Sequence, residues 1–291
     1  MFKTKNISIV GVYLDGKKLL VGKVKNGTIQ KSVSIKVNHN SPEDVLIEEI
    51  IRAIDQVIDN EVTGIGVGAP SVVNVDKGIV YQVRQIPSWK EVHIKEILEN
   101  KFNVQVYVNN DANCFAAGEK YFGLAKNYEN IVGLILDIGV GAGIIFKGHL
   151  YSGTNCGAGE FGSIPYKEHD YEYYCGEKYF EEKYGLTSDT LYNRAVNQDK
   201  IALALYEQYG RDLGNLIKTI LYAIDPEIIV LGGNIAKGFP YFEKEMKRTI
   251  KSFSYKHSLK HFKVMMSENE NIAILGAVAL FYDAQNMMML K

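Results

Sequence analysis

The chain has little excess charge, few cysteines and no long apolar run. Its 291 residues carry 33 Lys and Arg against 34 Asp and Glu, a net charge of −1 without a basic block. This composition argues against a nucleic-acid partner. No segment reaches the roughly 18 apolar residues of a membrane span, and no signal core follows the first lysines. The three cysteines, Cys114, Cys156 and Cys175, are scattered, as free thiols in a reducing compartment are. We therefore expect a cytoplasmic protein with no membrane partner.

What the chain does have is a pattern of strands and helices that occurs twice. The first half predicts strands at 7–14, 18–24 and 28–37, a helix at 42–59, a glycine-rich buried strand at 64–70, an irregular segment at 71–93 and a helix at 94–101. The second half predicts strands at 131–136, 143–147, 228–231 and 262–265, and helices at 176–184, 188–197, 199–224 and 272–286. The repeated order predicts α/β architecture, with two lobes around a cleft.

The stretch 108–119, V-N-N-D-A-N-C-F-A-A-G-E, joins a strand to a helix. Apolar alternation ends before Asn109 and helical spacing begins at Ala112, so Asp111 stands at the junction. A carboxylate at the carboxyl end of a strand can take a proton from a hydroxyl, while the flanking amides fix neighbouring hydroxyls. The alternative is that Asp111 only caps the helix.

Glycine-rich turns follow three of the predicted strands, at 15–17, 137–143 and 232–233. Glycine at a strand end lets backbone N–H groups approach an anion without a Cβ in the way. One such turn is usually only a tight turn. Three of them together with Asp111 indicate a nucleotide held against a hydroxyl-bearing substrate.

Four motifs carry a resemblance to a known family: N-N-D-A-N at 109–113, G-V-G-A-G-I-I-F-K-G-H-L-Y-S-G at 139–153, G-A-G-E-F-G at 157–162 and I-V-L-G-G-N at 229–234. The chain resembles the ROK sugar kinases and repressors of the actin/hexokinase/heat-shock-70 superfamily over nearly its whole length. The resemblance implies a bilobal actin-like ATPase (ribonuclease H-like) fold with duplicated domains. It also implies a small domain over 1–110, joined by the closing helix at 272–291, a large domain over 111–271, and a homodimer.

The resemblance further implies that Asp111 is a general base, which deprotonates a sugar hydroxyl for attack on the γ-phosphate of ATP bound with Mg²⁺. Asn110, Glu160 and Glu182 align with sugar-hydroxyl ligands, and we expect Asn110, Asp111 and Glu160 to converge on one cleft. A solvated loop acid is the alternative for Glu160, and a surface helix residue for Glu182. The nucleotide-binding residues would be Gly16, Lys17, Gly139, Gly141, Gly143, Gly232 and Gly233.

Both phosphate turns depart from the family pattern. Active members read Asp-x-Gly-Gly-Thr in the first turn, where this chain has Tyr13-Leu14-Asp15-Gly16-Lys17, so a tyrosine replaces the acid near the metal. The second turn usually begins Gly-Thr-Gly and here reads Asp137-Ile138-Gly139. Asp137 could hold Mg²⁺ instead, or it could only cap the hairpin. Lys17 could offset phosphate charge.

The zinc ligands of the family are also replaced. One His and three Cys correspond here to Ser163, Tyr173, Cys175 and Phe180. One thiol among four ligands does not make a tetrahedral site, so we expect no bound zinc, with the aromatic side chains filling the space. Ser163, and Gln85 in place of an asparagine, also change the sugar site and leave the sugar unnamed.

Three functions compete. The first is an ATP-dependent kinase that uses Asp111, and the second is a sugar-binding or regulatory relative that has lost phosphoryl transfer. The third is a repressor, which we disfavour because no helix-turn-helix precedes the first strand. The Asn110–Asp111 pair favours catalysis, whereas Tyr13 and Ile138 favour its loss. We prefer the kinase interpretation.

Overall fold

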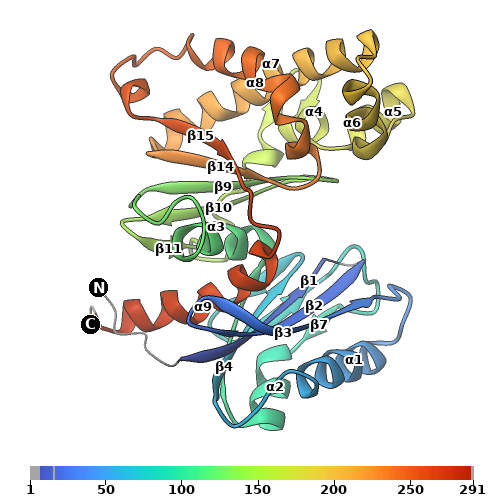
Figure 1. Cartoon of the computed structure of the whole chain (residues 1–291), viewed down its shortest axis with the longest axis vertical. Helices are drawn as coiled ribbons and strands as arrows, with labels where there is room; N and C mark the ends of the chain where they lie inside the picture. The colour runs from blue at the N-terminus through green and yellow to red at the C-terminus, as the bar shows by residue number, and fades with distance from the viewer. Residues whose placement is uncertain (1–6, 16, 290–291) are drawn as a thin grey trace. The chain divides into compact units, whose positions relative to one another are not determined.

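The computed structural model describes residues 7–15 and 17–289, which pack as two compact units (Figure 1). Unit 1 holds the described residues up to Lys126, the segment His149–Ala158 and the described residues from Asn269 onward, and unit 2 holds Asn127–Gly148 and Gly159–Glu268. The closing helix thus falls in unit 1. Unit 1 also includes helix α3 (Asp111–Tyr121), which packs against the closing helix α9 (Ile272–Met289).

Unit 1 is built on one sheet whose strand order is β3-β2-β1-β4-β8. Its strands are β1 (Ser8–Leu14), β2 (Lys18–Lys25), β3 (Thr28–Lys36), β4 (Val62–Ala69) and β8 (Gln105–Asn110). The first three form antiparallel pairs, while β4 and β8 run parallel to β1. Helices α1 (Glu43–Asp55) and α2 (Ile94–Phe102) cover one face and α9 the other (Figure 1). The carboxyl ends of β1, β4 and β8 therefore meet at one edge.

The segment expected to be irregular contains a small antiparallel sheet. Its strands are β5 (Val72–Asn74), β6 (Ile79–Tyr81) and β7 (Glu91–Val92). Each has only two or three residues, too few for a period-2 pattern to show in the sequence. Trp89, 1% exposed, belongs to the hydrophobic core on the α1–α2 side of the main sheet. The segment is therefore a packed part of unit 1.

Glycines on β1 and β4 allow helix α9 to approach the sheet backbone. A Cβ built on Gly66 would lie 1.8 Å from the carbonyl oxygen of Ala277, and one on Gly11 would lie 2.4 Å from that of Ile274. The glycines at 64–70 were expected to let something approach the backbone, and the structure shows that this is the closing helix.

We expect Gly66→Ala to lower the free energy of unfolding by about 1–3 kcal/mol or more, because the new methyl group forces the helix off the strand. Gly157→Ala is the matched control, since nothing lies within 4 Å of a Cβ at that position. Urea denaturation followed by circular dichroism measures both. Equal stability of the two variants would contradict this account of the packing.

Unit 2 repeats the arrangement of a hairpin followed by parallel strands. In its sheet β10 (Val140–Phe146), β9 (Ile131–Leu136), β14 (Ile228–Gly232) and β15 (Lys263–Met266) are neighbours in that order. Only β9 and β10 are antiparallel. The duplication expected from the sequence is therefore present in the topology, although β10 begins three residues before the expected strand at 143.

The helices of unit 2 are α4 (Tyr171–Cys175), α5 (Lys178–Tyr184), α6 (Ser188–Val196), α7 (Lys200–Ile224) and α8 (Phe239–Ile250). Helix α7 packs along α8 (Figure 1). The short strands β12 (Pro165–Tyr166) and β13 (His169–Asp170) form a hairpin before α4, and β11 (His149–Tyr151) lies in the segment assigned to unit 1. No described helix of the chain is long and apolar enough to cross a membrane.

Candidate functional site

Asp111 is the first residue of α3, at the point where β8 ends. The N-cap of this helix is Asn110, whose Oδ1 accepts a 2.8 Å hydrogen bond from the backbone N–H of Asn113. Asp111 is half-buried, and its Oδ1 accepts from the N–H of Ala112 at 2.9 Å. Since Asn110 fills the capping role, capping does not account for the carboxylate at position 111.

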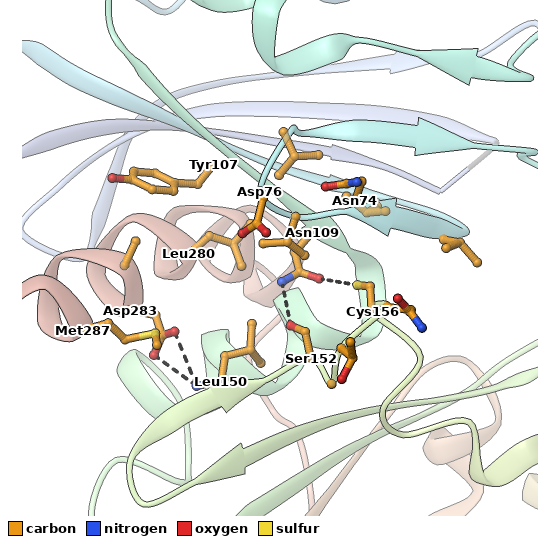
Figure 2. Close-up of a pocket in the computed structure, with 18 of the residues that line it drawn as sticks. Asn74, Asp76, Tyr107, Asn109, Leu150, Ser152, Cys156, Leu280, Asp283 and Met287 are labelled. Carbon is orange, nitrogen blue, oxygen red and sulfur yellow. Dashed lines mark hydrogen bonds between the residues drawn. The ribbon is translucent and has the colours of Figure 1, made fainter.

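Asn109 connects this junction to the loop that follows β11. Its side chain is buried, and its Oδ1 accepts 2.8 Å hydrogen bonds from the N–H of Asn110 and from Nδ2 of Asn113. The same oxygen lies 3.5 Å from Sγ of Cys156, and Nδ2 donates to Oγ of Ser152 at 3.4 Å (Figure 2). Asn109 thus fixes the end of β8. The sequence indicates this residue only as part of the N-N-D-A-N motif.

A cavity of about 550 Å³ runs beside β8 in unit 1 (Figure 2). Tyr107 and Asn109 from β8, Leu150, and Leu280 and Asp283 from α9 contribute to its lining. Asn110 and Asp111 are not among the lining residues. The lining thus reaches Asn109 at the strand-to-helix junction but does not include Asp111.

Asp283, 5% exposed, accepts hydrogen bonds from Tyr121 Oη at 3.1 Å and from the N–H of Leu150 at 3.3 Å. Burial raises the pKa of Asp283 above its ordinary 3.8, although these hydrogen bonds oppose the shift. The folded state then holds the proton more tightly than the unfolded state does. Stability must fall as the pH rises from 3.8 through the raised pKa.

We expect the free energy of unfolding of the wild type to fall relative to that of Asp283→Asn as the pH rises through this range. Above the range, the difference between the two proteins should stay constant. Chemical denaturation at a series of pH values measures the effect. Asp76→Asn, at an exposed carboxyl that lines the same cavity, is the control. A difference between Asp283→Asn and the wild type that does not change with pH would contradict the assignment.

The first glycine-rich turn joins β1 to β2. Gly16 lies outside the described residues, and Lys17 is exposed. Oδ1 of Asp15 accepts from the N–H groups of Lys17 at 2.8 Å and Lys18 at 2.6 Å. Tyr13 lies on β1 opposite Gly68 of β4. Two of the backbone N–H groups that a phosphate could use in this turn are therefore held by a carboxylate of the chain itself.

The second turn joins β9 to β10 and shows a similar feature. The N–H of Asp137 donates to the carbonyl of Gly139 at 3.0 Å, and the exposed Ile138 forms the tip. Oε2 of Glu172 on α4 accepts from the N–H of Val140 at 3.4 Å. Glu172 was not predicted as a site residue, because it lies far from the turn along the chain and belongs to no motif.

Gly232 is the last residue of β14, and Gly233 follows it beside this second turn. A Cβ on Gly233, whose φ is +89°, would lie 2.2 Å from the carbonyl oxygen of Leu136, so the two turns are in close contact at one edge of the unit 2 sheet. Gly141 and Gly143 lie within β10, paired with β9. Unit 2 thus brings Gly233 beside the end of β9, where the second turn begins.

The two predicted acidic sugar ligands lie in unit 2. Glu160 is exposed and directly precedes the 3₁₀ turn Phe161–Ser163. Glu182 is exposed on α5 and pairs with Lys178 at 3.6 Å. Asp111 and Asn110 belong to unit 1, so the expected convergence with Glu160 remains a prediction.

Three of the four residues at the family's zinc positions are packed among aromatic side chains. Tyr173 stacks on His169 with ring centroids 4.1 Å apart, and the buried Phe180 lies 5.6 Å from Tyr209. Cys175 is buried, which raises the pKa of its thiol, whereas Ser163 is exposed. Among the described residues, no group of three or more His, Cys, Asp and Glu could hold a metal ion. The absence of zinc remains a prediction.

The sequence of the chain is similar to those of known proteins over most of its length. The profile of the ROK family matches residues 9–284. A xylose repressor of Bacillus subtilis is 30% identical over 88% of this chain and 72% of the repressor. A glucokinase of Thermotoga maritima is 25% identical over 94% of this chain and 97% of the glucokinase.

The fold has counterparts among solved structures. A ROK family glucokinase from Streptomyces griseus, in complex with glucose and AMPPNP, superposes with a TM-score of 0.79 at 20% identity and covers 94% of this chain and 98% of that one. This confirms the α/β actin-like ATPase fold that the sequence predicts. Together with the profile match over nearly the whole length, it shows that the chain belongs to the ROK family.

Proposed function

We propose that the protein transfers the γ-phosphoryl group of ATP to a hydroxyl of a hexose or hexose derivative, with Asp111 as the general base. The observation that carries the proposal is the junction of β8 and α3. Asn110 caps the helix through its amide oxygen, which leaves the Asp111 carboxylate at the carboxyl end of a parallel strand. In open α/β sheets this is the usual place for a ligand.

The remaining roles follow from the same proposal. Asn110, Glu160 and Glu182 would bind sugar hydroxyls, and positioning of the hydroxyl beside Asp111 would supply much of the rate enhancement. The turns with Lys17, Gly139 and Gly233 would bind the nucleotide. Glucokinases among the relatives, one of them seen with glucose and AMPPNP, support ATP as the donor.

Mg²⁺ fits the donors of the second turn. The turn contributes the Asp137 carboxyl, and Gly139 adds no side chain beside it. One carboxylate together with phosphate oxygens and water is a ligand set that Mg²⁺ accepts. When bound there, the ion would neutralise phosphate charge. The protein's own part is to hold that carboxylate at the end of β9.

A second candidate function is sugar binding without phosphoryl transfer. It is favoured by Asp15 and Glu172, whose carboxylates accept from backbone N–H groups of both hairpin turns, and by Tyr13 in place of an acid. A phosphate would have to displace these carboxylates. The xylose repressor among the relatives shows that the family includes proteins other than kinases.

An ADP-release assay across hexoses, amino sugars, β-glucosides and xylose separates the two functions when it is combined with calorimetric titration of the same sugars. Turnover with at least one sugar is the expected result. Binding without turnover would favour the second function, and neither binding nor turnover would overturn both. The proposal includes a cytoplasmic homodimer, and light scattering of the purified protein measures the oligomeric state.

A further inference from the structure

We infer that Lys167 and Asp212 position the segment that carries Glu160, through an ion pair that is flanked by tyrosine rings in unit 2 and whose carboxylate is buried. The inference rests on the sugar-binding role proposed for Glu160. Neither residue belongs to a motif that the sequence analysis identified. The pair joins the tip of the β12–β13 hairpin to the middle of helix α7.

Asp212 is 1% exposed, yet three side chains donate hydrogen bonds to its carboxylate. Tyr166 Oη donates to Oδ1 at 2.9 Å, Lys167 Nζ donates to the same oxygen at 2.5 Å, and Gln208 Nε2 donates to Oδ2 at 2.9 Å. A buried carboxylate is costly unless it is paired and hydrogen-bonded. The buried carboxylate of Asp212 therefore stabilises the arrangement in which Lys167 is paired with it.

Two tyrosine rings flank the lysine ammonium group. Nζ of Lys167 lies 5.0 Å from the ring centroid of Tyr166 and 4.6 Å from that of Tyr174, within the range of cation–π attraction. The backbone of Lys167 has φ +53°, a left-handed conformation that is uncommon for residues other than glycine. Such a conformation persists where surrounding contacts hold it, and here the ion pair and the rings supply those contacts.

The hairpin transmits this anchoring to the Glu160 segment over a short distance. The 3₁₀ turn Phe161–Ser163 leads directly into β12, and the N–H of Tyr171 donates to the carbonyl of Ile164 at 3.1 Å. On the other side, a Cβ on Gly162 would lie 2.7 Å from the carbonyl oxygen of Val140. The segment after Glu160 is therefore held against β10 at one end and anchored to α7 at the other.

Lys167→Met tests the inference, because it keeps the apolar stem and removes the charge. We expect the KM for the sugar to rise about tenfold with kcat changed less than about threefold, since ligand placement is lost rather than the base. We also expect backbone amides at 159–174 to exchange with deuterium about tenfold faster. Lys167→Arg should restore much of both properties, because it keeps the charge and the ring contacts.

Lys247→Met is the matched control. Lys247 also lies 2.5 Å from a carboxylate, that of Glu243, but this pair is exposed on α8. Exposed pairs contribute little, so neither the KM nor the exchange should change. Equal effects of the two Met variants would overturn the inference, as would unchanged exchange at 159–174 in Lys167→Met. Faster exchange throughout unit 2 would show a merely stabilising pair and would overturn it as well.

The exchange experiment separates this inference from the proposed function. If the wild type binds and phosphorylates no sugar, the function assigned to Glu160 fails. The local exchange at 159–174 still shows whether the ion pair holds the segment. If sugars bind and the KM of Lys167→Met equals that of the wild type, the function stands and the positioning role falls.

Discussion

Replacing Asp111 by Asn should lower kcat by about 10²–10⁴-fold, the usual contribution of a positioned general base. Asparagine has the shape of aspartate and can still accept the hydrogen bond from the N–H of Ala112, but it does not take up a proton from a hydroxyl. The helix should therefore start as before, and the sugar Kd should stay within about threefold, because only a transition-state interaction is removed.

Single-turnover phosphorylation and calorimetric sugar binding measure these two effects separately. Asp199→Asn is the matched control, since Asp199 also stands at the start of a helix and its Oδ1 accepts from the N–H groups of Ile201 and Ala202. Asparagine caps a helix as well as aspartate does, so this control should keep full activity. A kcat of Asp111→Asn equal to that of the wild type would remove Asp111 from the mechanism.

Most elements with a strong local signal could be predicted closely. The strand expected at 7–14 is observed as Ser8–Leu14, and the helix expected at 199–224 is observed as Lys200–Ile224. Apolar alternation in the local sequence marks the strand, and apolar residues at helical spacing after a capping Asp mark the helix. The helix expected at 42–59 ends earlier, at Asp55, because residues 56–61 form a turn in which Asp59 pairs with Lys23 of β2. That pairing joins residues distant in sequence.

In the candidate site, too, the residues marked by a local sequence motif could be predicted, and those defined by contacts with distant residues could not. The strand-to-helix junction with Asn110 and Asp111 is local, and the sequence located it to the residue, although the structure assigns the cap to Asn110. Glu172 and Asp212 act through contacts with residues some 30 or more positions away. Neither lies in a motif, so no pattern in the sequence predicts that Glu172 reaches the second turn or that Asp212 receives Lys167.

The second large effect is expected at the turn between β9 and β10. Asp137→Asn should lower Mg²⁺-dependent phosphoryl transfer by about 10²-fold or more, the scale of losing one charge-stabilising group. Sugar affinity should barely change. If Asp137 only stabilises the hairpin, asparagine serves equally well in a turn and the substitution should have no effect. Rates measured over a range of Mg²⁺ concentrations distinguish the two roles.

Glu172→Gln is the matched control, because it removes one negative charge from the same turn. Its carboxylate accepts from the N–H of Val140, a donor that a phosphate would use, so its loss should leave transfer unchanged or raise it. A fall in both variants would mean that the turn merely needs negative charge. A fall in Asp137→Asn alone would mark the metal ligand.

Tyr13→Asp completes this test, because it returns an acid to the position where active relatives carry one. Tyr13 lies on β1 opposite Gly68, and the aspartate side chain is shorter than the tyrosine it replaces. If the rest of the site is sound, the second carboxylate should raise the transfer rate and lower the Mg²⁺ concentration needed for half-maximal activity. If neither the wild type nor Tyr13→Asp phosphorylates any sugar, there is no phosphoryl transfer in which Asp111 could act as the general base. The kinase assignment then falls, and sugar binding without transfer takes its place.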